Sequence, residues 1–300
     1  MQIQWYPGHM AKTRRLMRED LKLVDVVVEV LDARIPRASR NPDFDDLFGA
    51  KKRVRVLNKA DLADPASLKA WCDAYRQEGI GAVSLSANRS GAAKQAVAAI
   101  SQAAQEAVAR AKARGMRKIV RAMVVGIPNV GKSTLTNCIA GGARAKTGDR
   151  PGVTRSKQWI RVNDYLELMD TPGMLWPKLE DPVDARHMAY VGTIRDEIMD
   201  QEQLAALLLA DLCRSHPGAV SGRYGIAEDV REEPMALLEA VCRRRGMLLP
   251  GSAADLARGA RTVLDEFRGG KLGRITLEQP GGEDDLDRAG ASAPDGADAD

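Results

Sequence analysis

The 300-residue sequence is poor in aromatic side chains, which make up 4% of its residues. Its core must therefore rest on Val, Leu, Ile, Ala and Met within the 44% hydrophobic content. The four cysteines form no Cys-x-x-Cys pair and are too sparse for a disulfide scaffold, which favours the reducing cytoplasm. No apolar run reaches the roughly 18 residues of a membrane span, and the first residues lack the apolar core of a secretion signal. We therefore expect a cytoplasmic protein without a membrane partner.

Charge is distributed unevenly along the chain. The formal net charge is only +4, but the last 20 residues carry seven acidic side chains and one basic side chain. Residues 1–280 therefore hold a net charge of +10, which favours a polyanionic partner such as RNA. The end of the chain is mostly Gly, Ala and Asp with hardly any large apolar side chain, so we expect residues 279–300 to form a disordered acidic tail.

Strand patterns and helix patterns alternate over the first part of the chain. Apolar, β-branched runs predict strands at 24–31, 53–57, 82–85, 119–125, 158–162 and 165–169. Helices are predicted at 9–18, 65–78, 92–113 and 132–140. This alternation is typical of an α/β fold with a parallel sheet flanked by helices. After about residue 180 the leucine spacing indicates helices alone, so a small all-helical domain is expected to follow.

A phosphate-binding loop is the strongest motif in the sequence. Residues 126–133 read Gly-Ile-Pro-Asn-Val-Gly-Lys-Ser, which fits GxxxxGK[ST] and lies between a predicted strand and a predicted helix. Its glycines let backbone N–H groups turn toward phosphate oxygens, Lys132 reaches the β- and γ-phosphates, and Ser133 binds Mg²⁺. The residues expected to contact the nucleotide here are Asn129, Val130, Gly131, Lys132, Ser133 and Thr134.

A second phosphate motif follows the last predicted strand. Residues 170–173 read Asp-Thr-Pro-Gly, and we expect Asp170 to hold Mg²⁺ through water while the Gly173 N–H contacts the γ-phosphate. Taken alone, these four residues also fit a proline turn with an Asp cap. Thr154 lies on a loop between the two motifs, where its hydroxyl is expected to join the Mg²⁺ shell when a triphosphate is bound.

Asn58-Lys59-Ala60-Asp61 has the form NKxD and predicts a guanine pocket. The Asp61 carboxylate can accept hydrogen bonds from guanine N1–H and N2–H₂, a pair of donors that adenine lacks. Sites built on such pairing reject the wrong analogue by roughly 10⁴-fold. The stem of Lys59 can pack along the base, and Ser86-Ala87 can present a backbone N–H to guanine O6. These features favour GTP over ATP.

The order of the motifs is unusual, because the guanine motifs precede the phosphate loop and Thr154 and Asp170 follow it. All of them are expected at the carboxyl ends of parallel strands beside one crevice, so a permuted chain order leaves the site intact. The permutation also places the Asp170 motif directly before the helical domain. A change of nucleotide state could therefore act on the position of that domain.

These motifs in this order resemble the circularly permuted ribosome-assembly GTPases of the YlqF/RbgA type. The resemblance covers about residues 1–278 and includes four further segments: Trp5–Met10, Asp32–Pro36, Asn41-Pro42 and Leu249–Gly251. It implies a permuted GTPase domain at 1–178, a helical RNA-binding domain at 179–278 and the tail at 279–300. It also implies a GTPase that is slow alone, is stimulated by the ribosomal subunit and acts in late maturation of the large (50S) subunit.

The resemblance further implies Mg²⁺ as cofactor, and rRNA and ribosomal proteins of the large-subunit precursor as partners of a monomer. It adds K⁺ as a second candidate cation at Asn129, although Asn129 could equally serve only to stabilise the loop turn. Two other functions stay open: a GTP-gated RNA-binding scaffold with incidental hydrolysis, and a DNA-binding regulator. No clear recognition helix supports the regulator, so no DNA partner is expected. The run Arg243–Arg245 is either an RNA phosphate contact or a solvated helix end.

Hydrolysis requires a positioned water for in-line attack on the γ-phosphate. Many GTPases carry Gln just after the second phosphate motif, but this chain has Met174, which cannot orient water by hydrogen bonding. The resemblance implies that His9 takes this catalytic role, since an unperturbed imidazole can accept a proton near neutral pH. The alternative is that His9 orders the N-terminal helix or touches RNA.

The substitution His9→Ala is expected to slow subunit-stimulated GTP hydrolysis while nucleotide affinity stays near that of the unmodified protein, because His9 would act on the water and not on the nucleotide. Turnover assays with ribosomal subunits, beside nucleotide titrations, check this. Unchanged stimulated turnover would remove His9 from the mechanism.

Overall fold

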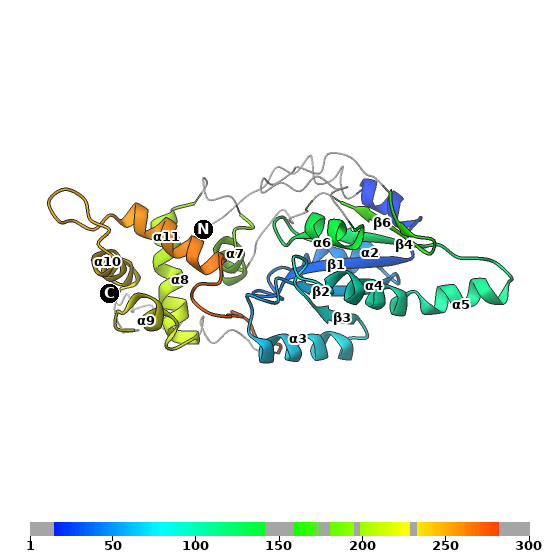
Figure 1. The fold of residues 1–300 in the computed structure, drawn as a ribbon, viewed down its shortest axis with the longest axis horizontal. Helices are drawn as coiled ribbons and strands as arrows, with labels where there is room; N and C mark the ends of the chain where they lie inside the picture. The colour runs from blue at the N-terminus through cyan, green and yellow to red at the C-terminus, as the bar shows by residue number, and fades with distance from the viewer. Residues whose placement is uncertain are drawn as a thin grey trace, which may run out of the picture.

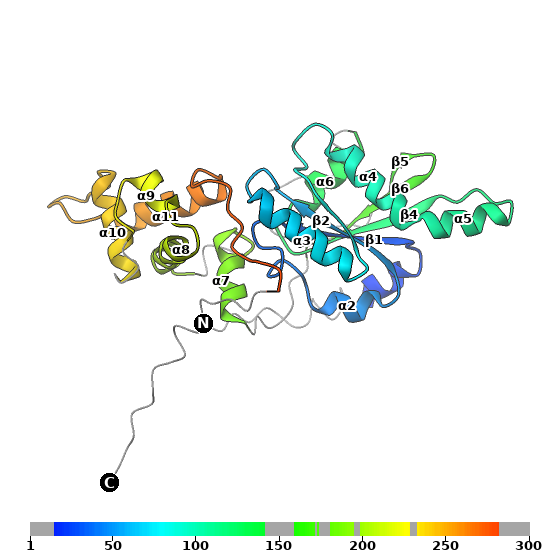
Figure 2. The ribbon, with the colours of Figure 1, turned by 90° about the horizontal axis from the view of Figure 1, so that it is seen from below.

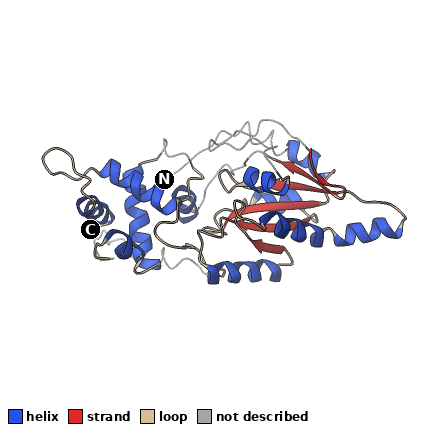
Figure 3. Cartoon of the chain, viewed as in Figure 1, coloured by secondary structure: helices blue, strands red, loops and turns tan. Residues whose placement is uncertain are grey.

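The computed structural model describes residues 15–141, 159–171, 173, 181–194, 199–228 and 233–281. Within these residues, a twisted sheet with helices on both faces lies beside a bundle of helices from the later part of the chain (Figures 1 and 3). No helix in this described part is long and apolar enough to cross a membrane. The expected α/β fold followed by a helical region is confirmed.

The sheet has six strands in the order β3-β2-β1-β4-β6-β5. They are β1 (Val26–Asp32), β2 (Lys52–Asn58), β3 (Gly81–Ser84), β4 (Val120–Val125), β5 (Trp159–Asn163) and β6 (Leu166–Asp170). All neighbouring pairs are parallel except β5 and β6, which form an antiparallel hairpin at one edge. Every residue of β1 is buried, as the apolar run at its core requires of a central parallel strand.

Helices cover both faces of this sheet. They are α2 (Asp43–Phe48), α3 (Pro65–Gln77), α4 (Ala92–Ala103), α5 (Gln105–Ala113) and α6 (Lys132–Ile139), together with a helical turn at residues 15–21. Val28 and Val30 pack in one core cluster with side chains of α4 and α6. Val27 points to the other face, where it packs with residues 15–21 and α2, and Leu31 packs there with α3. Because successive side chains of a strand point to opposite faces of the sheet, β1 contributes to a core on each face.

The long helix expected at 92–113 is instead two consecutive helices, α4 and α5, which meet at Ala104. The two segments bury different amounts of surface. In α4, Ala92, Ala96 and Ile100 are buried against the sheet, whereas α5 buries only Ala111 and projects past the end of the sheet (Figure 1). The chain turns at the point where the sheet no longer offers an apolar face to cover.

The helical bundle is built around α8 (Gln201–Ser215), whose leucines are almost all buried. Around it lie α7 (Pro182–Tyr190), α9 (Ala219–Tyr224), α10 (Pro234–Arg244) and α11 (Leu256–Arg268). Asp181 and Asp200 begin α7 and α8 by accepting hydrogen bonds from backbone N–H groups of the first turn. The strongly amphipathic α11 turns Ala260, Val263 and Leu264 into the core.

After α11 the chain returns to the α/β part, a feature that the sequence did not predict. In this C-terminal segment, residues 274–279, the N–H of Ile275 donates to Leu62 O at 2.9 Å and that of Leu277 donates to Arg34 O at 2.8 Å. Figure 2 shows the segment running from α11 toward α3 and α7. The helical bundle is therefore connected to the α/β part at both of its ends.

Glu278 anchors this segment. Its buried carboxylate accepts hydrogen bonds from the backbone N–H groups of Arg37 at 2.6 Å and of Ala38 at 3.2 Å. It also lies 2.9 Å from Nδ1 of His187, a buried residue of α7. One carboxylate therefore satisfies polar groups of the α/β part and of the helical bundle.

Glu278→Ala is expected to lower the free energy of unfolding by about 3 kcal/mol, because it leaves buried N–H groups and an imidazole without a partner. Urea denaturation followed by circular dichroism measures the change. Glu239→Ala is the control: Glu239 forms an exposed pair with Arg243 one helical turn away, and its loss should cost less than about 0.5 kcal/mol. Similar losses in both variants would contradict the anchoring role of Glu278.

Candidate nucleotide-binding site

The predicted nucleotide motifs lie together at one edge of the sheet. The Asn58 motif ends β2, Ser86 and Ala87 follow β3, the phosphate loop joins β4 to α6, and Asp170 ends β6. These strands are parallel, so their carboxyl ends point to the same edge, which is where α/β folds bind their ligands.

Asn58 joins three of these motifs. Its side-chain Nδ2 donates to Val130 O at 2.8 Å, and its Oδ1 accepts from the Ala87 N–H at 2.9 Å. The approach to the phosphate loop is close, because a Cβ on Gly131 would overlap Asn58 Nδ2. Gly131 also has a φ of 93°, so both its conformation and its neighbour require glycine there.

The rest of the NKxD motif is fixed by its neighbours. The Asp61 N–H donates to Ser86 Oγ at 2.9 Å, which holds the two guanine motifs in register. The Asp61 side chain keeps 23% of its surface exposed, and its Oδ2 lies 3.7 Å from Nη2 of the exposed Arg89. Lys59 donates from Nζ to Asn129 O at 2.7 Å and pairs with Asp32 Oδ2 at 2.9 Å. The NKxD motif therefore contacts both the phosphate loop and the Ser86-Ala87 motif.

Lys132 is buried in the phosphate loop, where its Nζ donates to Ile127 O at 2.8 Å. Burial lowers the pKa of Lys132 to about 8, although the nearby Asp170 opposes this shift. Gly173 approaches the same ammonium group, since a Cβ on Gly173 would lie 2.9 Å from Lys132 Nζ. The structure thus brings Gly173 beside the phosphate loop, as its predicted contact with a γ-phosphate requires.

Ser133 and Asp170, the two described residues that the sequence predicts to hold Mg²⁺, lie in direct contact. Ser133 Oγ donates to Asp170 Oδ2 at 2.8 Å, while the buried Asp170 Oδ1 has no hydrogen-bond partner among the described residues. Burial also raises the pKa of Asp170. A hydroxyl and a carboxylate with a free oxygen form the donor set that Mg²⁺ prefers, so these residues fit that cation.

Of the other predicted site residues, two are described by the structure and two are not. Thr134 lies exposed in the first turn of α6. Asn129 has a left-handed φ of 62°, and its side chain donates to Gly192 O at 2.7 Å. His9 and Thr154 lie outside the described residues, so their predicted roles stay predictions.

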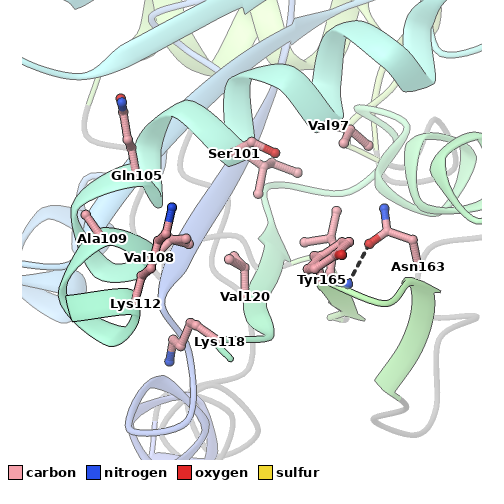
Figure 4. A pocket seen from close by; sticks show the side chains of 12 residues that line it. Val97, Ser101, Gln105, Val108, Ala109, Lys112, Lys118, Val120, Asn163 and Tyr165 are labelled. Carbon is pink, nitrogen blue, oxygen red and sulfur yellow. Dashed lines mark hydrogen bonds between the residues drawn. The ribbon is translucent and has the colours of Figure 1, made fainter. Parts of the chain in front are cut away.

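A separate cavity of about 530 Å³ lies at the opposite end of the sheet, between α4, α5 and the starts of β4 and β6. Figure 4 shows Val97, Val108 and Val120 around it with Tyr165 at its side. None of its lining residues belongs to the nucleotide motifs. The nucleotide site is therefore defined by its polar contacts and not by this apolar cavity.

Comparison with known proteins agrees with this geometry. A family model described as 50S ribosome-binding GTPase matches residues 121–231, which include both phosphate motifs. The chain is 45% identical over 282 residues to ribosome biogenesis GTPase A of Priestia megaterium, covering 93% of this chain and 98% of that relative. The chain belongs to the ribosome biogenesis GTPase A family. The resemblance to YlqF/RbgA proteins is thereby confirmed.

Two further relatives show how widely this GTPase family extends. Mitochondrial ribosome-associated GTPase 1 of Mus musculus is 33% identical over 92% of this chain and 90% of its own length. The solved structure of YlqF from T. maritima with bound GNP aligns with a TM-score of 0.61 at 25% identity, covering 90% of this chain and 99% of that one. The chain is accordingly a GTPase with the fold of this family.

The affinity of the GTPase for GDP is expected to fall about tenfold between roughly pH 7 and pH 9. The phosphates are predicted to bind the charged ammonium of Lys132, and the free protein loses that proton as the pH rises through the lowered pKa of about 8. Titrations with a fluorescent GDP at several pH values measure this. Guanosine, which shares the base but lacks phosphates, is the control and should show a smaller decline; an equal decline would contradict the role of Lys132.

Proposed function

We propose that this GTPase uses the cycle of GTP binding and hydrolysis to drive late maturation of the large ribosomal subunit. The observation that supports the proposal is the bridging of the phosphate loop and the guanine motifs by Asn58, which holds these predicted motifs together at one edge of the sheet. Relatives over nearly the whole chain are named ribosome biogenesis GTPase A, and the matching family model is described as 50S ribosome-binding.

In this proposal, Asp61 reads guanine, and Lys132 and the Gly173 N–H contact the β- and γ-phosphates. Ser133 and Asp170 would hold Mg²⁺, with Thr154 as a further ligand when a triphosphate is bound. The cation would neutralise charge on the phosphates. K⁺ is proposed as a second cation near Asn129, and His9 as the residue that positions the attacking water.

The proposed division of the chain is a permuted GTPase domain at 1–178, a helical RNA-binding domain at 179–278 and an acidic tail at 279–300. The net charge of +10 on residues 1–280 supports an RNA partner. In the helical domain, Arg243 pairs with Glu239 and Arg245 lies over the ring of Tyr224, while the side chain of Arg244 is exposed. We place the protein in the cytoplasm as a monomer that acts on large-subunit precursors.

Co-sedimentation with large-subunit precursors is the experiment that tests this function. The protein is expected to pellet with the particles in a non-hydrolysable GTP analogue, and to do so less with GDP, because assembly factors of this kind would be released after hydrolysis. Adding the particles should also stimulate GTP turnover. Lys132→Ala, which removes the phosphate-binding ammonium, is the control and should abolish the dependence on nucleotide.

Equal pelleting with GTP analogue, GDP and no nucleotide, together with unstimulated turnover, would contradict the proposed function. The scaffold alternative is separated by a variant that binds GTP but does not hydrolyse it. If such a variant supports subunit maturation fully, hydrolysis is incidental and the protein is a GTP-gated scaffold.

A further inference from the structure

The segment Asp32–Pro36 begins at the last residue of β1 and lies outside the nucleotide motifs. Asp32 is 1% exposed, and its carboxylate accepts from Arg34 Nε at 2.9 Å and from Arg34 Nη2 at 2.7 Å. The same carboxylate pairs with Lys59 of the guanine motif at 2.9 Å. Burial alone would raise the pKa of Asp32, but the two cations lower it well below its usual range. Asp32 therefore stays charged and holds both cations.

Arg34 continues this contact toward the helical bundle. Its guanidinium is buried, lies 5.6 Å from the ring centroid of Phe267 in α11, and donates from Nη1 to Arg268 O at 3.4 Å. Arg268, the last residue of α11, donates from its side chain to Tyr190 O and Ala189 O, both at 3.0 Å. These carbonyls end α7, where a positive charge is favourable. The end of α11 thus joins Arg34 to α7.

The turn after α7 leads back to the phosphate loop. Gly192 O accepts from Asn129 Nδ2 at 2.7 Å, and Thr193 Oγ1 donates to Pro128 O at 3.3 Å. The backbone carbonyl of Asn129 in turn accepts a hydrogen bond from Lys59 Nζ, so the series of contacts returns to the residue that pairs with Asp32. We call this set the contact ring; its members are Asp32, Arg34, Lys59, Asn129, Arg268 and the turn at 189–193.

We propose that the contact ring couples nucleotide binding to the position of the helical bundle, with Asp32 positioning Lys59 and Arg268 positioning Asn129. The inference rests on the proposed function only in taking a guanine nucleotide as the ligand. Two residues of the predicted nucleotide site, Lys59 and Asn129, are members of a ring that also passes through α7 and α11. A nucleotide that fixes them fixes the turn after α7, and by linkage a displaced bundle alters nucleotide affinity.

Buried charge gives the ring its stiffness. The carboxylate of Asp32 and the guanidinium of Arg34 are 1% and 2% exposed, so neither can exchange its partner for water without a large cost. The contacts to Gly192 and Asn129, in contrast, are made by the exposed side chain of Asn129 and by Lys59, whose side chain keeps 25% of its surface exposed. An element that couples two states requires both kinds of contact: buried contacts that stay in place and more exposed contacts that can change.

The first test is Arg268→Ala in the full chain, measured by titration with a fluorescent GDP and with a non-hydrolysable GTP analogue. Arg268 lies in the helical bundle, away from the nucleotide motifs, yet its loss is expected to weaken nucleotide binding about fivefold or more, within the usual range of coupling between sites. The matched control is Arg223→Ala. Arg223 of α9 pairs with Glu266, which lies in α11 as Arg268 does, but this pair stays within the bundle, so its loss should leave affinity unchanged. Wild-type affinity in Arg268→Ala would overturn the proposal.

The second test asks whether the ring acts as one unit. Asp32→Asn, which keeps the shape but removes the charge that holds Lys59, should weaken binding too, and the double variant with Arg268→Ala should lose little more than the weaker-binding single variant. Fully additive losses would overturn the ring. If circular dichroism shows that Asp32→Asn does not fold, Arg268→Lys replaces it: a retained cation at the end of α7 should restore part of the affinity, and no restoration would count against the proposal.

Amide hydrogen exchange tests the reverse direction of the coupling. Saturating GDP is expected to slow exchange at 186–194 in the unmodified protein but not in Arg268→Ala, while the phosphate loop is protected in both. A peptide from α10 serves as the internal control. GDP protection at 186–194 that persists in Arg268→Ala would overturn the role of Arg268. These measurements use the protein without ribosomal particles, so their failure is distinct from failure of the proposed function.

Discussion

The bridging amide of Asn58 is the interaction on which the nucleotide site depends. A side-chain amide offers both a donor and an acceptor, and Asn58 uses one on the phosphate loop and the other on the loop after β3. Because it is buried, losing either partner would leave a polar group unsatisfied. Two loops that are distant in sequence, the phosphate loop and the loop that carries Ser86 and Ala87, are thereby held beside each other.

Burial also prepares the site electrostatically. The same enclosure lowers the pKa of Lys132 and raises that of Asp170, so in the free protein both charged forms are disfavoured. Phosphates beside the ammonium and a cation beside the carboxylate would reverse both effects. The binding energy of the nucleotide is in this way tied to groups that the fold has already desolvated and oriented. Asp32 differs, because Arg34 and Lys59 keep it charged without any ligand.

The permuted order of the motifs explains how the two parts of the chain are connected. The positions of the motifs do not depend on where the chain begins within the sheet, because each motif is positioned by the end of its own strand. The position of the cut instead determines which part of the chain comes after the last motif. Beyond Asp170 the chain enters the helical bundle, and the segment 274–279 brings it back to Arg34 and Leu62. The nucleotide site and the bundle are therefore neighbours along the chain and also in space.

Local pattern was sufficient to predict the strands, the phosphate loop and the NKxD motif, because periodicity and motif spacing are properties of short segments. Even the meeting of the motifs could be inferred, since parallel strands share one carboxyl edge. Only the tertiary structure showed four other features: the break at Ala104, the antiparallel direction of β5, the return of Glu278 to Arg37 and the contacts of Asp32. These features depend on contacts between residues that are far apart in the sequence. Arg34 and Arg268, for example, are hydrogen-bonded although 234 positions separate them, and the periodicity of a short segment does not identify such a partner.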